Sequence, residues 1–551
     1  MQGLMQDYPL TLPPVFDRAE RLFGGKQIIW GTATGRERCT LAEWADRTRR
    51  MGGVLDALGV PADGRVGTFA WNTADHLGLY WAAPCSGRVL HTLNIRLFPD
   101  QLTYIVNHAQ DDVIFVDRSL LGLFWKLVPT FETVRHFVVL DDGAPTEIPD
   151  DPRMLRIEDL LAEAAPVRFS ADDENAAAAM CYTSGTTGNP KGVVYSHRSL
   201  YLHALSALNA AGGIALTERD RILPVVPLFH ANAWGFAQSP LFAGAELVLP
   251  GPQMAPDKIV AMLEEEKVTF TGGVPTIWMG MLPLLDGRDL SSLRTILCGG
   301  SAVPKALSEA YRAKLGKPIL HAWGMTETSP LGSVNWMATA YDGLGEDDLA
   351  DVRARQGIPP VGVDARIVEP GTTTELPWDD KATGELQVRG PWIAKAYYRT
   401  EPSDDSFTED GWLRTGDVGA IDQHGNIRLS DRTKDLVKSG GEWISSVELE
   451  NHLMGHPAVA EAAVIGVPHA RWQERPLAAV VLKPGATATK DELIDYLRPR
   501  VAKWWLPDDV VFIDEVPKTS VGKFSKKDLR TRFADYQLPT VDAANAPADL
   551  G

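Results

Sequence analysis

The chain has 551 residues, of which 44% are hydrophobic and 23% are charged. This length exceeds what one hydrophobic core supports, so we expect two or more packed units of ordinary globular composition. The formal net charge of −18 disfavours nucleic acids and anionic membrane surfaces as partners, because both are polyanions.

The four cysteines are scattered, without the spacing of a metal site or a disulfide framework. The N-terminus lacks a basic segment followed by an apolar core, which is the pattern of a secretory signal. No apolar run reaches the ~18 residues that a bilayer-spanning helix requires. We therefore expect a cytoplasmic protein without integral membrane association.

Short apolar runs rich in β-branched residues alternate with stretches of helical periodicity through the first part of the chain. Such alternation is typical of α/β proteins with largely parallel sheets that are covered by helices. Strands are predicted at 113–116, 137–140, 247–249 and 295–298, and helices at 256–266 and 304–315.

The pattern changes after Gly384, where short alternating strands are separated by glycine and aspartate turns up to Ser430. A compact α+β pattern follows, with helices expected at 446–453 and 490–497 and strands at 462–465 and 477–482. The last residues are mostly small and polar. The predicted organisation is an N-terminal domain over 1–430, a small C-terminal domain over 431–536, and a disordered tail over 537–551.

The densest motif runs from Cys181 to Gly192 with the sequence CYTSGTTGNPKG. Glycines let backbone N–H groups approach an anion, hydroxyls donate hydrogen bonds, and a lysine adds positive charge. By composition alone, a mobile polar loop fits as well. Gly185 is not followed by Gly-Lys-Ser/Thr at the spacing of a Walker A loop. The motif resembles the phosphate loop of the acyl-adenylate-forming superfamily, which includes acyl-CoA synthetases, firefly luciferase and peptide-synthetase adenylation domains.

The resemblance continues in the order of that superfamily through HAWGMTETSP from His321, GWLRTGD ending at Asp417, DRTKD from Asp431 and PKTSVGK ending at Lys523. It implies α/β subdomains and a strand-rich subdomain in the large domain, and a mobile α+β C-terminal domain. The implied activity is that of an acid–CoA ligase. A carboxylate and ATP give acyl-AMP and pyrophosphate, and acyl-AMP and coenzyme A then give acyl-CoA and AMP. ATP, Mg²⁺ and coenzyme A are the cofactor and co-substrates implied.

The resemblance assigns Thr326 to the α-phosphate and Glu327 to Mg²⁺, a hard cation that suits a carboxylate ligand. Asp417 would accept hydrogen bonds from two ribose hydroxyls, with Arg432 on the same side of the sugar. Trp323 stands where the family usually has tyrosine, and its indole would stack on adenine. The implied ATP site comprises Thr183, Ser184, Gly185, Thr186, Thr187, Lys191, Gly300, Ser301, Ala302, His321, Trp323, Gly324, Met325, Thr326, Asp417 and Arg432.

Lys523 is expected to bring its ammonium group to the carboxylate and the α-phosphate, where charge develops during adenylation. With Thr326 and Glu327 it forms the implied catalytic set. Thioester formation needs space for pantetheine, which the family provides by rotating its C-terminal domain, and Asp431 matches the hinge. The implied coenzyme A site comprises Lys438, Gly440, Gly441, Glu442 and Trp443.

His230, Trp234 and Gly273 are expected to border the acyl pocket. Amino-acid-activating relatives typically carry an aspartate in place of His230, which pairs with the substrate ammonium group, so an amino acid is disfavoured. Trp234 falls where long-chain acyl-CoA synthetases can carry an aromatic gate, although an ordinary core tryptophan fits equally well. The expected substrate is a medium- or long-chain fatty acid.

Three alternatives stay open at this point. The HAWGMTETSP segment also resembles ligases for 3-methylthiopropionate, a short acid. A luciferase-like oxygenase would share the adenylation step, and a non-catalytic nucleotide-binding module would share the fold, although it would not need Lys191, Glu327, Asp417, Arg432 and Lys523 together. Because related long-chain enzymes are often dimers, a homodimer is also compatible with the sequence.

Overall fold

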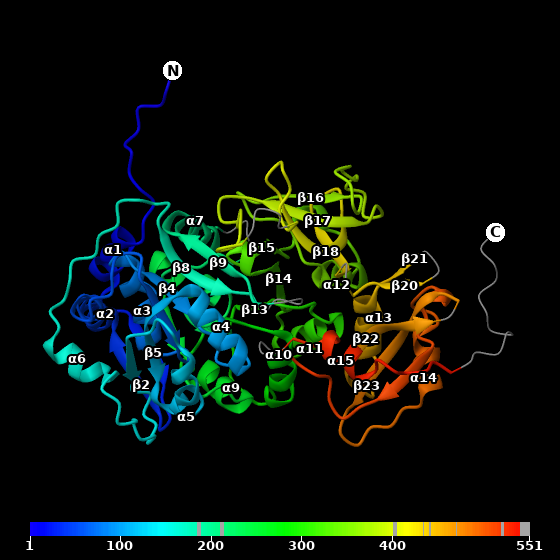
Figure 1. Ribbon diagram of the computed structural model, residues 1–551. Helices are drawn as coiled ribbons and strands as arrows, with labels where there is room; N and C mark the ends of the chain where they lie inside the picture. The colour runs from blue at the N-terminus through cyan, green and yellow to red at the C-terminus, as the bar shows by residue number, and fades with distance from the viewer. Residues whose placement is uncertain are drawn as a thin grey trace.

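The computed structural model describes residues 1–183, 189–209, 214–400, 405–432, 435–439, 442–469, 471–519 and 523–539. Two large sheets form the left and central part of the molecule, and a smaller unit lies to the right in Figure 1. In both large sheets the central strand pairs are parallel, and antiparallel pairs occur at the sheet edges. The α/β class predicted from the sequence is confirmed.

The first large sheet has the strand order β7-β6-β5-β3-β4-β8-β9, and its pairs are parallel except for β8 with β9. Its central strands are buried on both faces, which fits their content of valine, isoleucine and phenylalanine. The strands are β3 (Arg65–Phe69), β4 (Val89–Thr92), β5 (Asp111–Asp117), β6 (His136–Leu140), β7 (Met154–Arg156), β8 (Ala177–Tyr182) and β9 (Gly192–Ser196).

The second large sheet has the order β15-β14-β13-β12-β10-β11-β1-β2, with antiparallel pairs at its two ends. It carries β14, from which the HAWGMTE motif enters the centre of the molecule. The strands are β1 (Gln27–Gly31), β2 (Arg36–Thr40), β10 (Arg221–Pro224), β11 (Glu246–Leu249), β12 (Phe270–Gly273), β13 (Thr295–Cys298), β14 (Leu320–Gly324) and β15 (Leu331–Val334).

Helices cover these sheets, and their starts follow local sequence signals. Thr40 and Glu43 form a capping box at the first turn of α2, and Pro256 occupies the first turn of α9, where its missing N–H costs nothing. The main helices are α1 (Pro13–Phe23), α2 (Leu41–Ala57), α3 (Ala74–Cys85), α4 (Pro99–Ala109), α7 (His197–Ala207), α9 (Pro256–Glu265), α10 (Pro275–Met281) and α11 (Lys305–Leu315).

An antiparallel sheet follows, with the strands β16 (Asp364–Val368), β17 (Gly384–Arg389), β18 (Leu413–Ile421) and β19 (Ile427–Arg432) in sequential order. It matches the strand-rich segment predicted after Gly384. Asp417 on β18 faces Arg432 on β19 as a cross-strand pair. Two residues that lie far apart in the sequence, both assigned to ribose, are therefore neighbours across this sheet.

The C-terminal unit has apolar cores built from residues after Leu436, so it is packed as a separate body. Ser445 and Thr489 cap its first two helices, as their positions before the predicted helices suggest. The elements are β20 (Val437–Ser439), β21 (Glu442–Ile444), α13 (Ser446–Met454), β22 (Val459–His469), β23 (Gln473–Leu482), α14 (Lys490–Leu497), β24 (Asp509–Phe512) and α15 (Lys526–Arg532).

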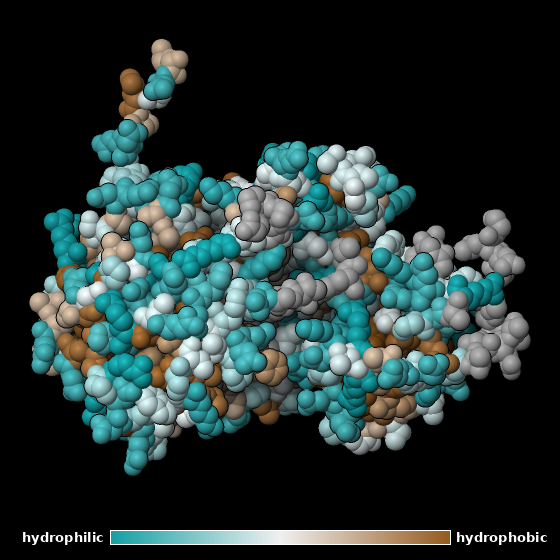
Figure 2. All heavy atoms as spheres, viewed as in Figure 1, coloured by the Kyte–Doolittle hydropathy of each residue, from teal (hydrophilic) through white to brown (hydrophobic). Residues whose placement is uncertain are grey.

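The two ends of the chain differ in their surroundings. The N-terminal end projects from the body in Figure 1, and its first residues, Leu4 and Met5 among them, are exposed. At the other end, Leu538 packs against the C-terminal core, whereas residues 540–551 of the predicted tail lie outside the described part. The face shown in Figure 2 is mostly hydrophilic, with hydrophobic side chains scattered over it. Within the described ranges, no helix has both the length and the apolar composition to cross a membrane.

Candidate active site

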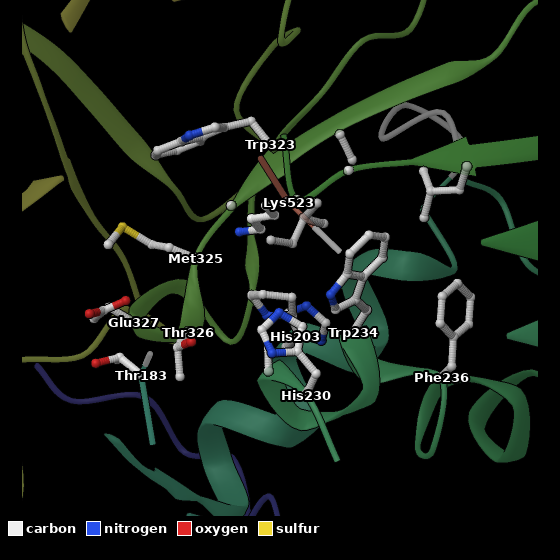
Figure 3. A pocket seen from close by; sticks show the side chains of 18 of the residues that line it. Thr183, His203, His230, Trp234, Phe236, Trp323, Met325, Thr326, Glu327 and Lys523 are labelled. Atoms are coloured by element: carbon white, nitrogen blue, oxygen red, sulfur yellow. The ribbon is translucent and has the colours of Figure 1, made fainter. Parts of the chain in front are cut away.

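A cavity of about 360 Å³ lies where the two large sheets, the antiparallel sheet and the C-terminal unit meet. Figure 3 shows Thr183, Thr326 and Glu327 on one side of this cavity, Trp234 and Phe236 on the other, and Lys523 between them. The predicted site residues in its wall are Thr183, Lys191, His230, Trp234, Gly300, Trp323, Gly324, Met325, Thr326, Glu327, Arg432 and Lys523.

The phosphate loop connects the antiparallel strands β8 and β9. Thr183 and Lys191 close its base, because the Thr183 N–H donates to the Lys191 carbonyl at 2.8 Å and the Lys191 N–H to Thr183 Oγ1 at 3.4 Å. The Lys191 ammonium lies 4.6 Å from the centroid of the Tyr397 ring. The predicted ligands Ser184, Gly185, Thr186 and Thr187 lie outside the described residues.

Glu327 follows β14 in a short 3₁₀ turn and is 5% exposed. The Tyr397 hydroxyl donates to Glu327 Oε1 at 2.6 Å, and burial raises the pKa of the Glu327 carboxyl. Thr326 precedes it, and the Tyr195 hydroxyl donates to the Thr326 carbonyl at 2.8 Å. The turn therefore has a fixed orientation, with a buried carboxylate beside the phosphate loop.

Asp417 does not line the cavity itself, but it contacts two residues that do. Its Oδ2 accepts a hydrogen bond from Trp323 Nε1 at 2.8 Å, and its Oδ1 lies 3.1 Å from Arg432 Nε. The Asp417 carboxylate raises the pKa of the Arg432 guanidinium. Asp417 and Trp323 are both buried, so their hydrogen bond lies in a largely dry environment, whereas the Arg432 side chain is partly exposed.

Lys523 reaches the cavity from the C-terminal unit. Its backbone is paired with Thr519, since the Thr519 N–H donates to the Lys523 carbonyl at 2.6 Å and the Lys523 N–H donates to Thr519 Oγ1 at 3.2 Å. Lys523 Cε lies 3.4 Å from the position that a Cβ on Gly300 would occupy. Gly300 has a φ of +84°, a backbone conformation that favours glycine at this position.

The turn that carries His230 and Trp234 has an unusual backbone. Ala231, Asn232, Ala233 and Trp234 all have positive φ angles, between 43° and 55°. A left-handed conformation costs about 1–2 kcal/mol for each residue with a side chain, so the surrounding structure must hold this turn in place. The Asn232 N–H donates to Cys181 Sγ at 3.2 Å, and the Ala233 N–H donates to the His230 carbonyl.

Apolar side chains line the cavity beyond this turn. The Trp234 indole packs against the backbone of Gly299, where an added Cβ would lie 3.3 Å from its ring. Burial, Lys523 and Arg96 lower the pKa of His230 to about 3, so its imidazole is neutral at neutral pH. Apolar residues of the cavity wall, besides Trp234, are Ala207, Ile214, Leu216, Phe236, Leu297, Ala322 and Leu331.

Several predicted site residues lie away from the cavity wall. Burial lowers the pKa of His321 to about 4, and its ring faces backbone carbonyls rather than the cavity. Gly273 lies against the Trp278 ring, and Asp431 accepts a hydrogen bond from the Ser446 N–H at 2.7 Å in the C-terminal unit. Ser301 and Ala302 follow Gly300 but are not part of the wall.

Of the predicted coenzyme A residues, Lys438 lies on β20 and Trp443 on β21, and the two strands pair antiparallel. The Lys438 ammonium lies 4.9 Å from the Trp443 ring centroid, and this indole is 42% exposed. In Figure 1 the hairpin lies in the C-terminal unit, well to the right of β14. Gly440, Gly441 and the Glu442 side chain lie outside the described residues.

Other residues of the wall were not assigned from the sequence. Tyr397 belongs to the pair Tyr397-Tyr398, to which no role was assigned. His203 on α7 and Ser239 belong to no recognised motif, and only the fold shows that they line the cavity. His203 is 3% exposed and its Nε2 has no hydrogen-bond partner among the described residues.

Two family models match the chain, one in its N-terminal part and one in its C-terminal unit. The model of AMP-binding enzymes matches residues 16–398, and the model of the AMP-binding enzyme C-terminal domain matches residues 448–523. The chain therefore belongs to the AMP-binding enzyme family.

Relatives of known activity narrow this class. The chain is 45% identical to a long-chain-fatty-acid–CoA ligase of Thermus thermophilus, with 97% of each chain covered. It is 42% identical to a 3-methylmercaptopropionyl-CoA ligase of Ruegeria lacuscaerulensis, covering 97% of this chain and 99% of that one. ATP-bound MatB of Rhodopseudomonas palustris superposes with a TM-score of 0.81 at 30% identity, covering 95% and 99% of the two chains. This chain is accordingly an AMP-forming acid–CoA ligase, with ATP and coenzyme A as substrates.

Proposed function

We propose that this ligase activates a medium- or long-chain fatty acid. The apolar part of the cavity wall, which includes Trp234 and Phe236, carries the proposal, because a chain of methylene groups gains free energy from leaving water for such a surface. The relatives are consistent with it. A medium-chain-fatty-acid–CoA ligase of Ectopseudomonas oleovorans is 38% identical, in addition to the long-chain ligase of Thermus thermophilus.

In this proposal, ATP lies on the side of Trp323 and Glu327. Adenine stacks on the Trp323 indole, the ribose hydroxyls donate to Asp417, and the β- and γ-phosphates enter the loop closed by Thr183 and Lys191. Thr326 lies next to Glu327 in the cavity wall, and its hydroxyl donates a hydrogen bond to the α-phosphate. Gly300, Gly324 and Met325 of the predicted ATP site also line the cavity.

Glu327 fits the role of a Mg²⁺ ligand. Its carboxylate is buried beside the phosphate loop, and Mg²⁺ is commonly held by one or two carboxylates together with substrate phosphates. The ion would neutralise phosphate charge when bound. The Tyr397 hydroxyl donates a hydrogen bond to Glu327 Oε1 and thereby orients the carboxylate for that role.

Adenylation requires the carboxylate of the substrate to approach the α-phosphate against charge repulsion. Lys523 lies between the nucleotide side and the acyl side, so its ammonium can stabilise negative charge on both groups as they approach. The neutral His230 adds no charge at the acyl entrance. A rotation about Asp431 would then remove Lys523 and bring the hairpin with Lys438 and Trp443 to the cavity for thioester formation.

We also propose that the domain boundary lies at 430/431, that the protein is cytoplasmic, and that it forms a homodimer. The first is supported by the separate cores of the C-terminal unit. Size-exclusion chromatography with light scattering measures the oligomeric state directly.

A second candidate substrate is 3-methylmercaptopropionate, and one observation favours it. His203 and Ser239 place polar groups on the acyl side, and His203 Nε2 is unpartnered among the described residues. A short acid with a heteroatom could contact these groups, whereas a saturated alkyl chain leaves them unsatisfied.

The test is pyrophosphate release with a series of acids from acetate to palmitate and with 3-methylmercaptopropionate, each with and without coenzyme A. A buried methylene is worth roughly 0.8 kcal/mol, so kcat/KM should rise about fourfold per methylene until the pocket ends. In Trp234→Ala, kcat/KM should change more for long acids than for propionate. A flat series with best activity on 3-methylmercaptopropionate would transfer the assignment to the second candidate. Light emission would indicate an oxygenase.

A further inference from the structure

The hydrogen bond between Trp323 and Asp417 joins an adenine-side residue to a ribose-side residue. The indole N–H donates to Asp417 Oδ2 at 2.8 Å, while the Arg432 guanidinium lies 3.1 Å from Oδ1. Each carboxylate oxygen therefore has one protein donor. A carboxylate offers about four acceptor positions in total, so one acceptor position on each oxygen is left for a ligand.

That remaining pair of acceptors matches the two hydroxyls of a ribose. We propose that Trp323 is a positioning residue that orients Asp417 for the simultaneous recognition of the 2′- and 3′-hydroxyls of ATP. The inference rests on the proposed role of Asp417 in ribose binding. It adds a function for the indole N–H that stacking on adenine does not require, because any aromatic ring can stack.

The neighbouring strand is adapted to this indole. Gly332 lies on β15, next to β14, and a Cβ added to it would come within 2.2 Å of Trp323 Cζ3. The added atom would collide with the benzene part of the ring, so the indole keeps its position only if residue 332 is glycine. The glycine and the hydrogen bond together determine where the carboxylate points.

The matched control is Trp392. It belongs to the same apolar cluster as Trp323, it is 3% exposed, and its Nε1 donates to the Leu331 carbonyl at 2.9 Å. Trp392→Phe thus removes a buried indole hydrogen bond of similar length that does not involve Asp417. Any loss that comes from packing alone should appear in both variants.

The experiment compares kcat/KM for ATP, 2′-deoxy-ATP and 3′-deoxy-ATP in adenylate formation. Trp323→Phe keeps an aromatic ring but loses the donor, so we expect the KM for ATP to rise roughly tenfold, the effect of losing one hydrogen bond to a charged group. The preference for ATP over both deoxy analogues should fall several-fold, because a carboxylate free to rotate no longer contacts both hydroxyls at once. Trp392→Phe should keep the wild-type preference.

Two further variants separate the inference from its premise. Gly332→Ala keeps the indole but displaces it, and it should lower the same preference. Asp417→Asn should abolish the preference if the carboxylate binds ribose. Loss of the preference in Asp417→Asn with an unchanged preference in Trp323→Phe would overturn the positioning role alone. An unchanged preference in Asp417→Asn would overturn the ribose assignment and the inference with it.

Discussion

Among the described residues that line the cavity, Lys523 alone comes from the chain after β19. Its ammonium lies at the centre of the cavity, between the turn of Thr326 and Glu327 and the turn that carries Trp234 (Figure 3). This placement agrees with a role in adenylation, in which negative charge accumulates between the carboxylate and the α-phosphate. A lysine that contributes only to solubility is expected at the surface of the protein and not in a cavity.

Lys523→Ala should lower the rate of adenylate formation by about 10²–10³-fold, the typical effect of losing one electrostatic contact to a transition state. Thioester formation from supplied acyl-AMP should persist, because coenzyme A attacks without this lysine in place. Stopped-flow pyrophosphate release and an acyl-AMP transfer assay measure the two steps. Lys527→Ala, a change of an exposed lysine on α15, serves as the control. Equal losses in both steps would contradict the assignment.

Residues that one motif places next to one another also lie together around the cavity, while their roles stay predictions. Thr183, Lys191, Thr326 and Glu327 all line the cavity, as their motifs suggest. The bond between Trp323 and Asp417 joins residues 94 positions apart, and its existence depends on how two sheets meet. Local sequence carries no signal for such a contact.

At the level of elements, β-branched runs gave reliable strands. The predicted segments at 113–116 and 137–140 lie within β5 and β6, and that at 295–298 coincides with β13. The predicted helix at 304–315 begins one residue later, because Pro304 is its N-cap. The left-handed turn from Ala231 to Trp234 could not be predicted, since Asn232 alone among its residues tolerates positive φ readily, whereas Ala231, Ala233 and Trp234 do not.

Asp431 lies near the end of β19, where the chain passes to the C-terminal unit, and it provides a test of alternation. Proline fixes φ near −65° and removes an N–H, so Asp431→Pro should hold the C-terminal unit near one orientation. With Lys523 trapped in the cavity, single-turnover pyrophosphate release should persist while thioester formation collapses. Trapping in the other orientation should give the reverse pattern.

Asp431→Ala is the control for this variant. It removes the acceptor of the Ser446 N–H but leaves the backbone free to rotate. Comparable activity of Asp431→Pro and wild type in both half-reactions, with intact folding, would mean that the chain pivots elsewhere.

At the level of the whole molecule, buried histidines couple stability to pH. His76, His197, His203 and His321 are buried, and burial lowers the pKa of each to about 4. In the unfolded chain these groups take up protons near pH 6.5. Their contribution to stability is therefore present above pH 6.5 and is lost as pH falls toward 4.

His203→Leu should remove one of these contributions. We expect the difference in unfolding free energy between wild type and variant to decline by up to about 1.4 kcal/mol per pH unit as pH falls from 6.5 to 4. Urea unfolding at a series of pH values measures it. A difference that does not vary with pH would show that His203 titrates alike in both states.

The presence of Lys523 in the cavity has a further consequence. The lysine behaves as a ligand tethered to its own receptor, and its occupancy depends on an effective concentration that the connecting chain sets. Diluting the enzyme leaves that occupancy unchanged, whereas a substitution at the contact between the two units alters it in every molecule. Such a substitution should change the rates of adenylation and of thioester formation in opposite directions. The surface where the two units meet can therefore adjust turnover without any change to the residues that touch substrate.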